Sequence, residues 1–243
     1  TKNIIKACKQ TNKHLIHVST AYVFDGKKND LYLETDKMNP IEWYGKTKAL
    51  AEEAVTSSDI KWTILRIDQP FRSDNFEKID ILHRIVSGLQ NDNLPPMFID
   101  HYFGPTYIDD FAQVVDFFIR TGKIGLFHAS SGEQWTDYKF AELIKKQLEN
   151  IFLSKNKKLA DIKISNLSTY LKTLNRPYQQ NTAMNCEKLA KILDFKMKSV
   201  EEAVGEVEVS QNKFIFGSVK KNNYDLDKRL KGNRIIKVKI KNN

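Results

Sequence analysis

The stretch HLIHVSTAYVFDG, residues 14–26, joins an apolar run to a polar turn. The run HLIHVS has the length and apolar content of a buried strand. Asp25-Gly26 has the composition of a turn. Ser19 and Thr20 therefore stand where the strand ends.

A helix and a second strand follow this strand along the chain. WYGKTKALAEEAV, residues 43–55, places Ala and Leu on one helical face and Lys and Glu on the other, and KWTILRI, residues 61–67, is again apolar. The order strand, helix, strand predicts a βαβ unit in a parallel sheet. Ligands of such sheets bind outside the carboxyl ends of the strands, which is where Ser19 and Thr20 are expected.

Tyr44 and Lys48 are four residues apart, so they share one face of the predicted helix. If that helix packs beside the first strand, a hydroxyl, a phenol and an ammonium group converge. The ammonium favours the phenolate and lowers the phenol pKa from its usual value of about 10. Such a site would protonate an alkoxide as hydride arrives at a carbonyl carbon.

The pattern Y-x-x-x-K is weak on its own, because it also occurs at Tyr224 and Lys228. That second copy has no strand-end hydroxyls before it and no helical pattern around it, so we interpret it as a chance match. The alternative for Tyr44 and Lys48 is a solvated helix face.

The first copy lies in a longer pattern, VSTAYVFDG, YLETDKMNP, YGKTKALAEEAV and WTILRI. This pattern resembles the extended short-chain dehydrogenase/reductase superfamily, and within it the RmlD-like dTDP-4-dehydrorhamnose reductase family. Twenty-four positions separate Thr20 from Tyr44, as in that family. RPYQQNTAMNCEKLAKILDFKMKSVEEAV, residues 176–204, resembles the family's C-terminal segment, so the resemblance covers roughly residues 1–205.

The resemblance implies roles for four residues of the strand end and helix. Thr20 would bind the keto oxygen of the substrate, and Tyr44 would be the general acid. Lys48 would hold the nicotinamide ribose and lower the tyrosine pKa. Ser19 would line the cofactor pocket, although a hydroxyl that satisfies backbone groups at the strand end is an equal alternative.

Three further residues resemble the family's substrate lobe. Asn75 and Phe76 match the Asn-Phe pair that begins a helix of that lobe. Arg176, in the segment RPY, would meet a phosphate of the nucleotide sugar, and a surface ion pair is its alternative. The expected substrate-binding residues are therefore Thr20, Asn75 and Arg176.

The chain also departs from the family pattern. Ala21 stands where the family usually has an acidic residue, and IDQPF, residues 67–71, replaces the usual TSWVY. None of the ten glycines forms G-x-x-G-x-x-G, the turn that binds a dinucleotide phosphate. The resemblance implies a fragment, in which a missing upstream part of roughly 80 residues holds the first strands and the phosphate-binding turn. Alone, it should bind a dinucleotide poorly.

The expected fold class is α/β, with a Rossmann-like parallel sheet that is partial because its first strands are missing, and with a smaller α+β substrate lobe. Residues 1–72 and 107–130 would form the C-terminal part of the NAD(P)-binding domain. Residues 73–106 and 131–205 would form the substrate-binding lobe. Residues 206–243 would be a basic tail, since they contribute +6 of the net charge of +9.

Composition excludes several classes of protein. The sequence has no apolar run of the roughly 18–20 residues that a membrane span needs and begins with no signal-peptide pattern. The two cysteines fit a reducing cytoplasm, and the five histidines lack metal-ligand spacing, so we expect a cytoplasmic protein with no metal and no membrane. His83, His101 and His128 are expected to be structural, and Glu34 and Asp36 to make local hydrogen bonds.

The function expected from the resemblance is reduction of a nucleotide-linked 4-keto-6-deoxysugar by NADPH or NADH, in dTDP-rhamnose biosynthesis. The cofactor would be NADP or NAD, the partner a nucleotide-sugar substrate, and a homodimer stays open. One alternative is another epimerase or dehydratase of the superfamily. A second is a non-catalytic regulatory subunit that binds a dinucleotide and resembles the methionine adenosyltransferase beta subunit. Nucleic-acid binding through the basic tail is a third reading, and we do not expect it.

Overall fold

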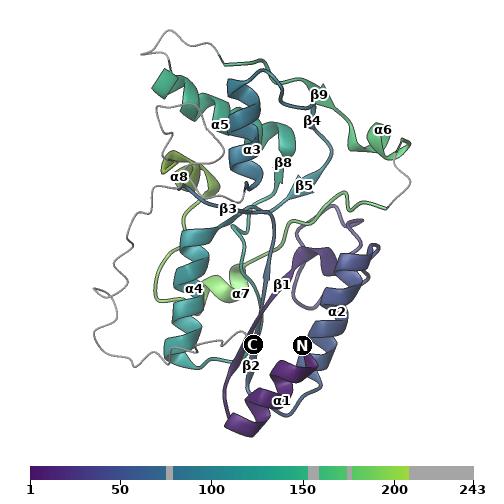
Figure 1. Ribbon diagram of the computed structural model, residues 1–243, viewed down its shortest axis with the longest axis vertical. Coiled ribbons are helices and arrows are strands. Elements are labelled where there is room, and N and C mark those ends of the chain that lie inside the picture. The colour runs from purple at the N-terminus through teal and green to yellow at the C-terminus, as the bar shows by residue number, and fades with distance from the viewer. Residues whose placement is uncertain (75–78, 153–158, 174–176, 208–243) are drawn as a thin grey trace, which may run out of the picture.

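The structure is a computed structural model that describes residues 1–74, 79–152, 159–173 and 177–207. One half is built on a three-stranded parallel sheet of β1 (Leu15–Thr20), β2 (Trp62–Ile67) and β7 (Gly125–His128), in the order β1-β2-β7. The predicted βαβ unit is confirmed, because α2 (Trp43–Thr56) connects β1 to β2 (Figure 1).

Helices cover both faces of this sheet. Leu65 of β2 packs in a cluster with Phe118 of α4 (Ile108–Thr121), whereas its neighbour Arg66 bonds to Glu52 of α2. Successive strand residues point to opposite faces, so α4 and α2 lie on opposite sides of the sheet. The short helix α7 (Glu187–Ala190) joins α4, and α1 (Lys2–Thr11) lies beside α2 (Figure 1).

The other half packs three helices around a separate apolar cluster. These are α3 (Ile81–Gln90), α5 (Asp137–Phe152) and α8 (Val200–Gly205). Two-residue strands surround them in pairs: β3 (Pro70–Phe71) with β6 (Thr106–Tyr107), β4 (Met97–Phe98) with β9 (Ile164–Ser165), and β5 (Tyr102–Phe103) with β8 (Trp135–Thr136). Two short elements complete the description, the 3-10 turn η1 (Ala21–Val23) and α6 (Leu167–Leu171).

The loop after η1 departs from the sequence-based expectation at one carboxylate. Asp36 makes the expected local bonds, accepting from the N–H of Leu33 at 2.8 Å and from Lys28 Nζ at 2.7 Å. The expectation for Glu34 is wrong, because its Oε1 accepts the N–H of His128 at 3.0 Å. The loop folds back over the carboxyl end of β7, and the glutamate satisfies that strand's last N–H.

A buried ion pair anchors α2 to the sheet. Arg66 Nε and Nη2 donate to Glu52 at 2.9 and 2.6 Å, and the two side chains are 3% and 1% exposed. Arg66 also lies 5.0 Å from the centre of the Phe24 ring, and its Nη1 lies 3.3 Å from His128 Nε2. Burial lowers the pKa of His128 to about 3, so this imidazole is neutral and accepts from the guanidinium. A buried pair tolerates only one geometry, and it therefore sets the rotation of α2.

A glycine lets the first turn of α2 approach η1. A Cβ at Gly45 would lie 2.1 Å from the carbonyl oxygen of Tyr22 and 3.0 Å from Pro40 Cβ. No side chain fits at that distance from a backbone oxygen. Gly45 therefore permits the contact between the start of α2 and the turn that follows β1.

We expect Glu52→Gln to lower the free energy of unfolding by about 3–5 kcal/mol, because it leaves Arg66 buried without a counter-charge. Glu52→Leu combined with Arg66→Met should recover most of that loss, since neither side chain then carries a charge into the interior. Urea unfolding measures both variants. In the control Glu187→Gln, which breaks an exposed 3.6 Å pair with Lys191, the change should stay within about 0.5 kcal/mol. A similarly small change in Glu52→Gln would contradict the anchoring role.

Gly45→Ala should lower the free energy of unfolding by about 1–3 kcal/mol, because the new methyl group forces α2 away from Tyr22. Gly205→Ala is the matched control, since a Cβ there would lie 3.9 Å from Gln147 Nε2, an ordinary van der Waals contact. Thermal and urea unfolding of the two variants, side by side, measure the difference. Equal effects at both positions would refute the close approach.

Candidate functional site

The candidate site lies at the carboxyl end of β1, where α2 begins. The carboxylate of Glu42 caps α2 by accepting the N–H of Tyr44 at 3.1 Å and of Gly45 at 2.6 Å. The Tyr44 ring meets the Tyr22 ring edge-on, with 6.0 Å between centroids and 72° between planes. Tyr44 is nevertheless 51% exposed, so its phenol is open to an incoming ligand.

Lys48 lies one turn further along α2 and reaches the edge of the sheet. Its Nζ donates to the carbonyl oxygen of Val18 at 2.7 Å. Leu15 donates its N–H to the carbonyl oxygen of Lys61, which precedes β2, so the backbone groups of every second residue from Leu15 face β2. The backbone groups of the residues between them, including Val18, point away from β2. Burial lowers the pKa of Lys48, and the charge of Glu52 opposes that shift.

Ser19 and Thr20 end β1 as buried hydroxyls. Thr20 Oγ1 accepts the N–H of Tyr22 at 3.3 Å through an oxygen lone pair, which leaves its hydrogen able to donate. Ser19 pairs in register with Arg66, so its side chain lies on the α2 side of the sheet. Within the described part of the chain, Ser19 Oγ is buried and has no hydrogen-bond partner.

The four residues expected around the chemistry thus come from two adjoining elements. Ser19 and Thr20 end the strand, and Tyr44 and Lys48 occupy the helix turns packed against that end. Asn75, Phe76 and Arg176 lie outside the described residues, as does the tail from residue 208 onward.

Sequence reasoning missed the residues that hold this arrangement together, namely Gly45 and Glu52. Two signals in the sequence were available. The first is that Glu52 is four residues after Lys48 and eight after Tyr44, on the same helix face. An arginine within the apolar run WTILRI was the other signal, because a buried guanidinium needs an acidic partner. Tyr22 is a wall residue and not a rival acid, since burial raises its pKa strongly.

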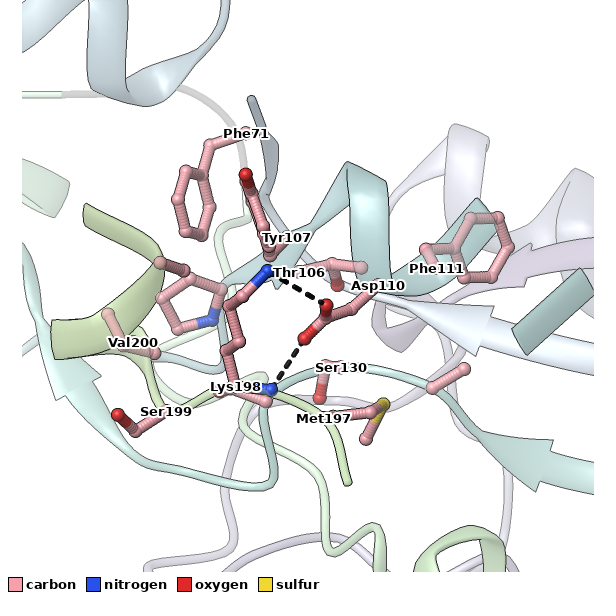
Figure 2. A pocket seen from close by; sticks show the side chains of 14 residues that line it. Phe71, Thr106, Tyr107, Asp110, Phe111, Ser130, Met197, Lys198, Ser199 and Val200 are labelled. Carbon is pink, nitrogen blue, oxygen red and sulfur yellow. Dashed lines mark hydrogen bonds and ion pairs between the residues drawn. The ribbon is translucent and has the colours of Figure 1, made fainter. Parts of the chain in front are cut away.

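A separate crevice lies on the far side of the sheet, between α4 and the segment before α8. Figure 2 shows Lys198 bridging it: its backbone N–H donates to Asp110 Oδ2 at 2.6 Å and its Nζ lies 3.8 Å from Asp110 Oδ1. The crevice encloses about 10 Å³, enough for about one water molecule. Its lining includes none of Ser19, Thr20, Tyr44 and Lys48. It is a packing seam and not a substrate cavity.

The described residues contain neither a metal-ligand cluster nor a membrane-spanning helix. Among these residues, no three or more His, Cys, Asp or Glu side chains gather as a metal site would require. None of the helices described is both long enough and apolar enough to span a bilayer.

Two curated relatives are similar in sequence to part of this chain. A dTDP-4-dehydrorhamnose reductase of Aggregatibacter actinomycetemcomitans is 32% identical over 161 residues, which are 61% of this chain and 53% of that protein. The methionine adenosyltransferase 2 subunit beta of Bos taurus is 31% identical over 157 residues, 57% of this chain and 43% of that protein. The chain spans about half the length of the curated relatives it matches.

Solved structures confirm the fold. A dTDP-4-dehydrorhamnose reductase of Bacillus anthracis, in complex with NADP, superposes with a TM-score of 0.70 at 21% identity, covering 83% of this chain and 67% of that one. A dTDP-4-dehydrorhamnose reductase of Clostridium acetobutylicum superposes with a TM-score of 0.71 at 23% identity, covering 84% of this chain and 68% of that one. The Rossmann-like α/β class expected from the sequence is therefore correct. The family model of the RmlD substrate binding domain matches residues 1–211, and the chain belongs to this family.

Proposed function

We propose that the complete protein reduces a nucleotide-linked 4-keto-6-deoxysugar with NADPH or NADH. The observation that carries this proposal is the assembly of Thr20, Tyr44 and Lys48 where α2 meets the end of β1. Membership of the RmlD substrate binding domain family and similarity to dTDP-4-dehydrorhamnose reductases support it.

In the proposed reaction, each residue has one task. The Thr20 hydroxyl donates to the keto oxygen of the substrate and orients it, since the oxygen lone pair already engages the N–H of Tyr22. The exposed Tyr44 phenol gives its proton to that oxygen as negative charge develops there. The ammonium group of Lys48 stabilises the phenolate that remains.

The residues at the strand end fit a nicotinamide cofactor. Ser19 Oγ is a buried hydroxyl without a partner among the described residues, and Lys48 Nζ lies against the carbonyl oxygen of Val18 in the same strand. We propose that these two groups, with Tyr44, hold the nicotinamide riboside. The reduced cofactor would supply the hydride. The chain has no glycine-rich phosphate turn, so the phosphates would be held by residues outside this sequence.

The substrate contacts complete the proposal. Asn75 and Arg176 would bind the nucleotide sugar from the lobe of residues 73–106 and 131–205, opposite the partial NAD(P)-binding domain of residues 1–72 and 107–130. Arginine suits a phosphate because its guanidinium donates two parallel hydrogen bonds.

A second candidate function is a regulatory subunit that binds a dinucleotide without turnover. The 31% identity to methionine adenosyltransferase 2 subunit beta favours it, as does Ala21, which leaves the turn after Thr20 without an acidic side chain. The two functions differ in stoichiometry: a reductase oxidises one NAD(P)H for each keto-sugar reduced, and a regulatory subunit binds the cofactor without consuming it. An epimerase likewise consumes none in net terms.

Tyr44→Phe should lower kcat by about 10²–10⁴-fold, because phenylalanine keeps the ring but has no proton to donate. The assay is NADPH or NADH oxidation by the complete protein with a dTDP-4-keto-6-deoxysugar. Tyr224→Phe is the matched control, since Tyr224 and Lys228 repeat the same spacing without the strand end, and its kcat should be unchanged.

Undiminished turnover in Tyr44→Phe would remove Tyr44 as the proton donor. Cofactor binding by the wild type without any oxidation across several keto-sugars would instead favour the regulatory subunit.

A further inference from the structure

Asp68 is a buried acid at the carboxyl end of β2, one strand away from Thr20. Its side chain is 1% exposed, and its Oδ2 accepts the Thr182 hydroxyl at 2.6 Å and the N–H of Gly104 at 3.0 Å. Its backbone carbonyl and N–H both bond to Thr106 Oγ1, at 2.7 and 3.0 Å. Three segments that are far apart in the sequence therefore meet at one carboxylate.

Thr182 belongs to residues 177–185, which we call the strap. The strap is bonded along the loop that follows β1. Gln179 Nε2 donates to the carbonyl oxygen of Phe24 at 3.4 Å, and Asn181 Nδ2 donates to that of Lys28 at 2.7 Å. The N–H of Asn181 also donates to Gly26 at 3.0 Å. The position of the strap thus determines the position of the loop that begins with Tyr22.

Tyr22 transmits that position to the candidate site. Its hydroxyl is hydrogen-bonded to Tyr178 of the strap, and its carbonyl oxygen lies against Gly45. Its ring meets Tyr44 edge-on. A shift of the strap would therefore move the wall on which Tyr44 rests.

We propose that Asp68 is a positioning residue of the Tyr44 site, which latches the strap to the edge of the sheet and so fixes Tyr22 against Tyr44. This inference rests on the proposed reductase function for its kinetic effect, but the latch itself does not depend on it.

The latch responds to pH because burial raises the pKa of Asp68 to about 6. The bonds from Thr182 and Gly104 oppose that shift, as does the charge of His101. Because burial outweighs those opposing groups, the closed strap favours the protonated acid over the ionised one, and the latch loosens as pH rises through about 6. The other titratable groups at this cluster are Tyr22, Tyr178 and, through His101 Nδ1, Asp137. Among the described residues, Asp68 Oδ1 and His101 Nε2 are buried without partners.

The kinetic test uses Asp68→Asn, which imitates the protonated acid at every pH. In the complete protein, its kcat/KM should stay within about twofold of the wild type at pH 5 and should be about tenfold higher than the wild type at pH 8, where ionisation opens the wild-type latch. Thr182→Val, which removes one donor of the latch, should lower kcat/KM about tenfold already at pH 5, and Thr182→Ser, which keeps the hydroxyl, should follow the wild type. The control Asp74→Asn, at an exposed position on the same segment, should change nothing at either pH. An equal loss at pH 5 and pH 8 would mark Asp68 as merely structural and overturn the proposal.

A second measurement needs no enzymatic activity. The folded wild type holds the Asp68 proton more tightly than the unfolded chain. Its free energy of unfolding should therefore fall, relative to that of Asp68→Asn, as pH rises from about 4 to about 6. At pH 8 the amide of Gly104 should exchange more slowly in Asp68→Asn than in the wild type. If the protein reduces no keto-sugar, these two shifts would still support the latch, and their absence would overturn it.

Discussion

The buried ion pair between Glu52 and Arg66 is the interaction on which the site's geometry depends. Removing two charges from water is costly, and only a fixed, bidentate arrangement offsets that cost. The pair therefore permits one rotation of α2 on the sheet. Glu52, Lys48 and Tyr44 recur every four residues on one helix face, so fixing Glu52 against β2 also fixes the other two at the end of β1. Gly45 then sets the distance, because the helix can close onto Tyr22 only without a side chain there.

Once α2 is fixed, the polar groups between α2 and the end of β1 differ in how deeply they are buried and in whether the protein satisfies their hydrogen bonds. Arg66 and Glu52 are buried and mutually satisfied, whereas Ser19 Oγ is buried without a partner and Tyr44 is half exposed. Lys48 lies between them, with its ammonium group on the carbonyl oxygen of Val18 in β1. A structural core satisfies its polar atoms internally, and a binding site leaves some of them for a ligand. Along about two turns of α2, the polar groups change from internally satisfied ones to ones that are left for a ligand.

Local sequence patterns predicted the elements that carry the site. The apolar run before Ser19 and the amphipathic run after Tyr44 have unambiguous periods. Predictions failed or were absent where a contact joins distant segments. Glu34 bonds to His128, 94 positions away, and Asp68 bonds to Thr182, 114 positions away. No local period encodes such pairs, because their partners are chosen by how the loops cross the edge of the sheet.

Local patterns in the amino-acid sequence are enough to place a βαβ unit with two hydroxyls at a strand end and a Tyr-x-x-x-Lys helix after it. These features follow from residues at most about fifty positions apart, so backbone periodicity and spacing suffice. Which polar groups become buried, and so which of them have shifted pKa values, depends on how distant segments pack together. Nothing in the segment IDQPF indicates an unusual pKa for Asp68, yet burial beside residues 104 and 182 raises that pKa to about 6. Desolvation is a property of the packed whole, and no single segment of the chain contains it.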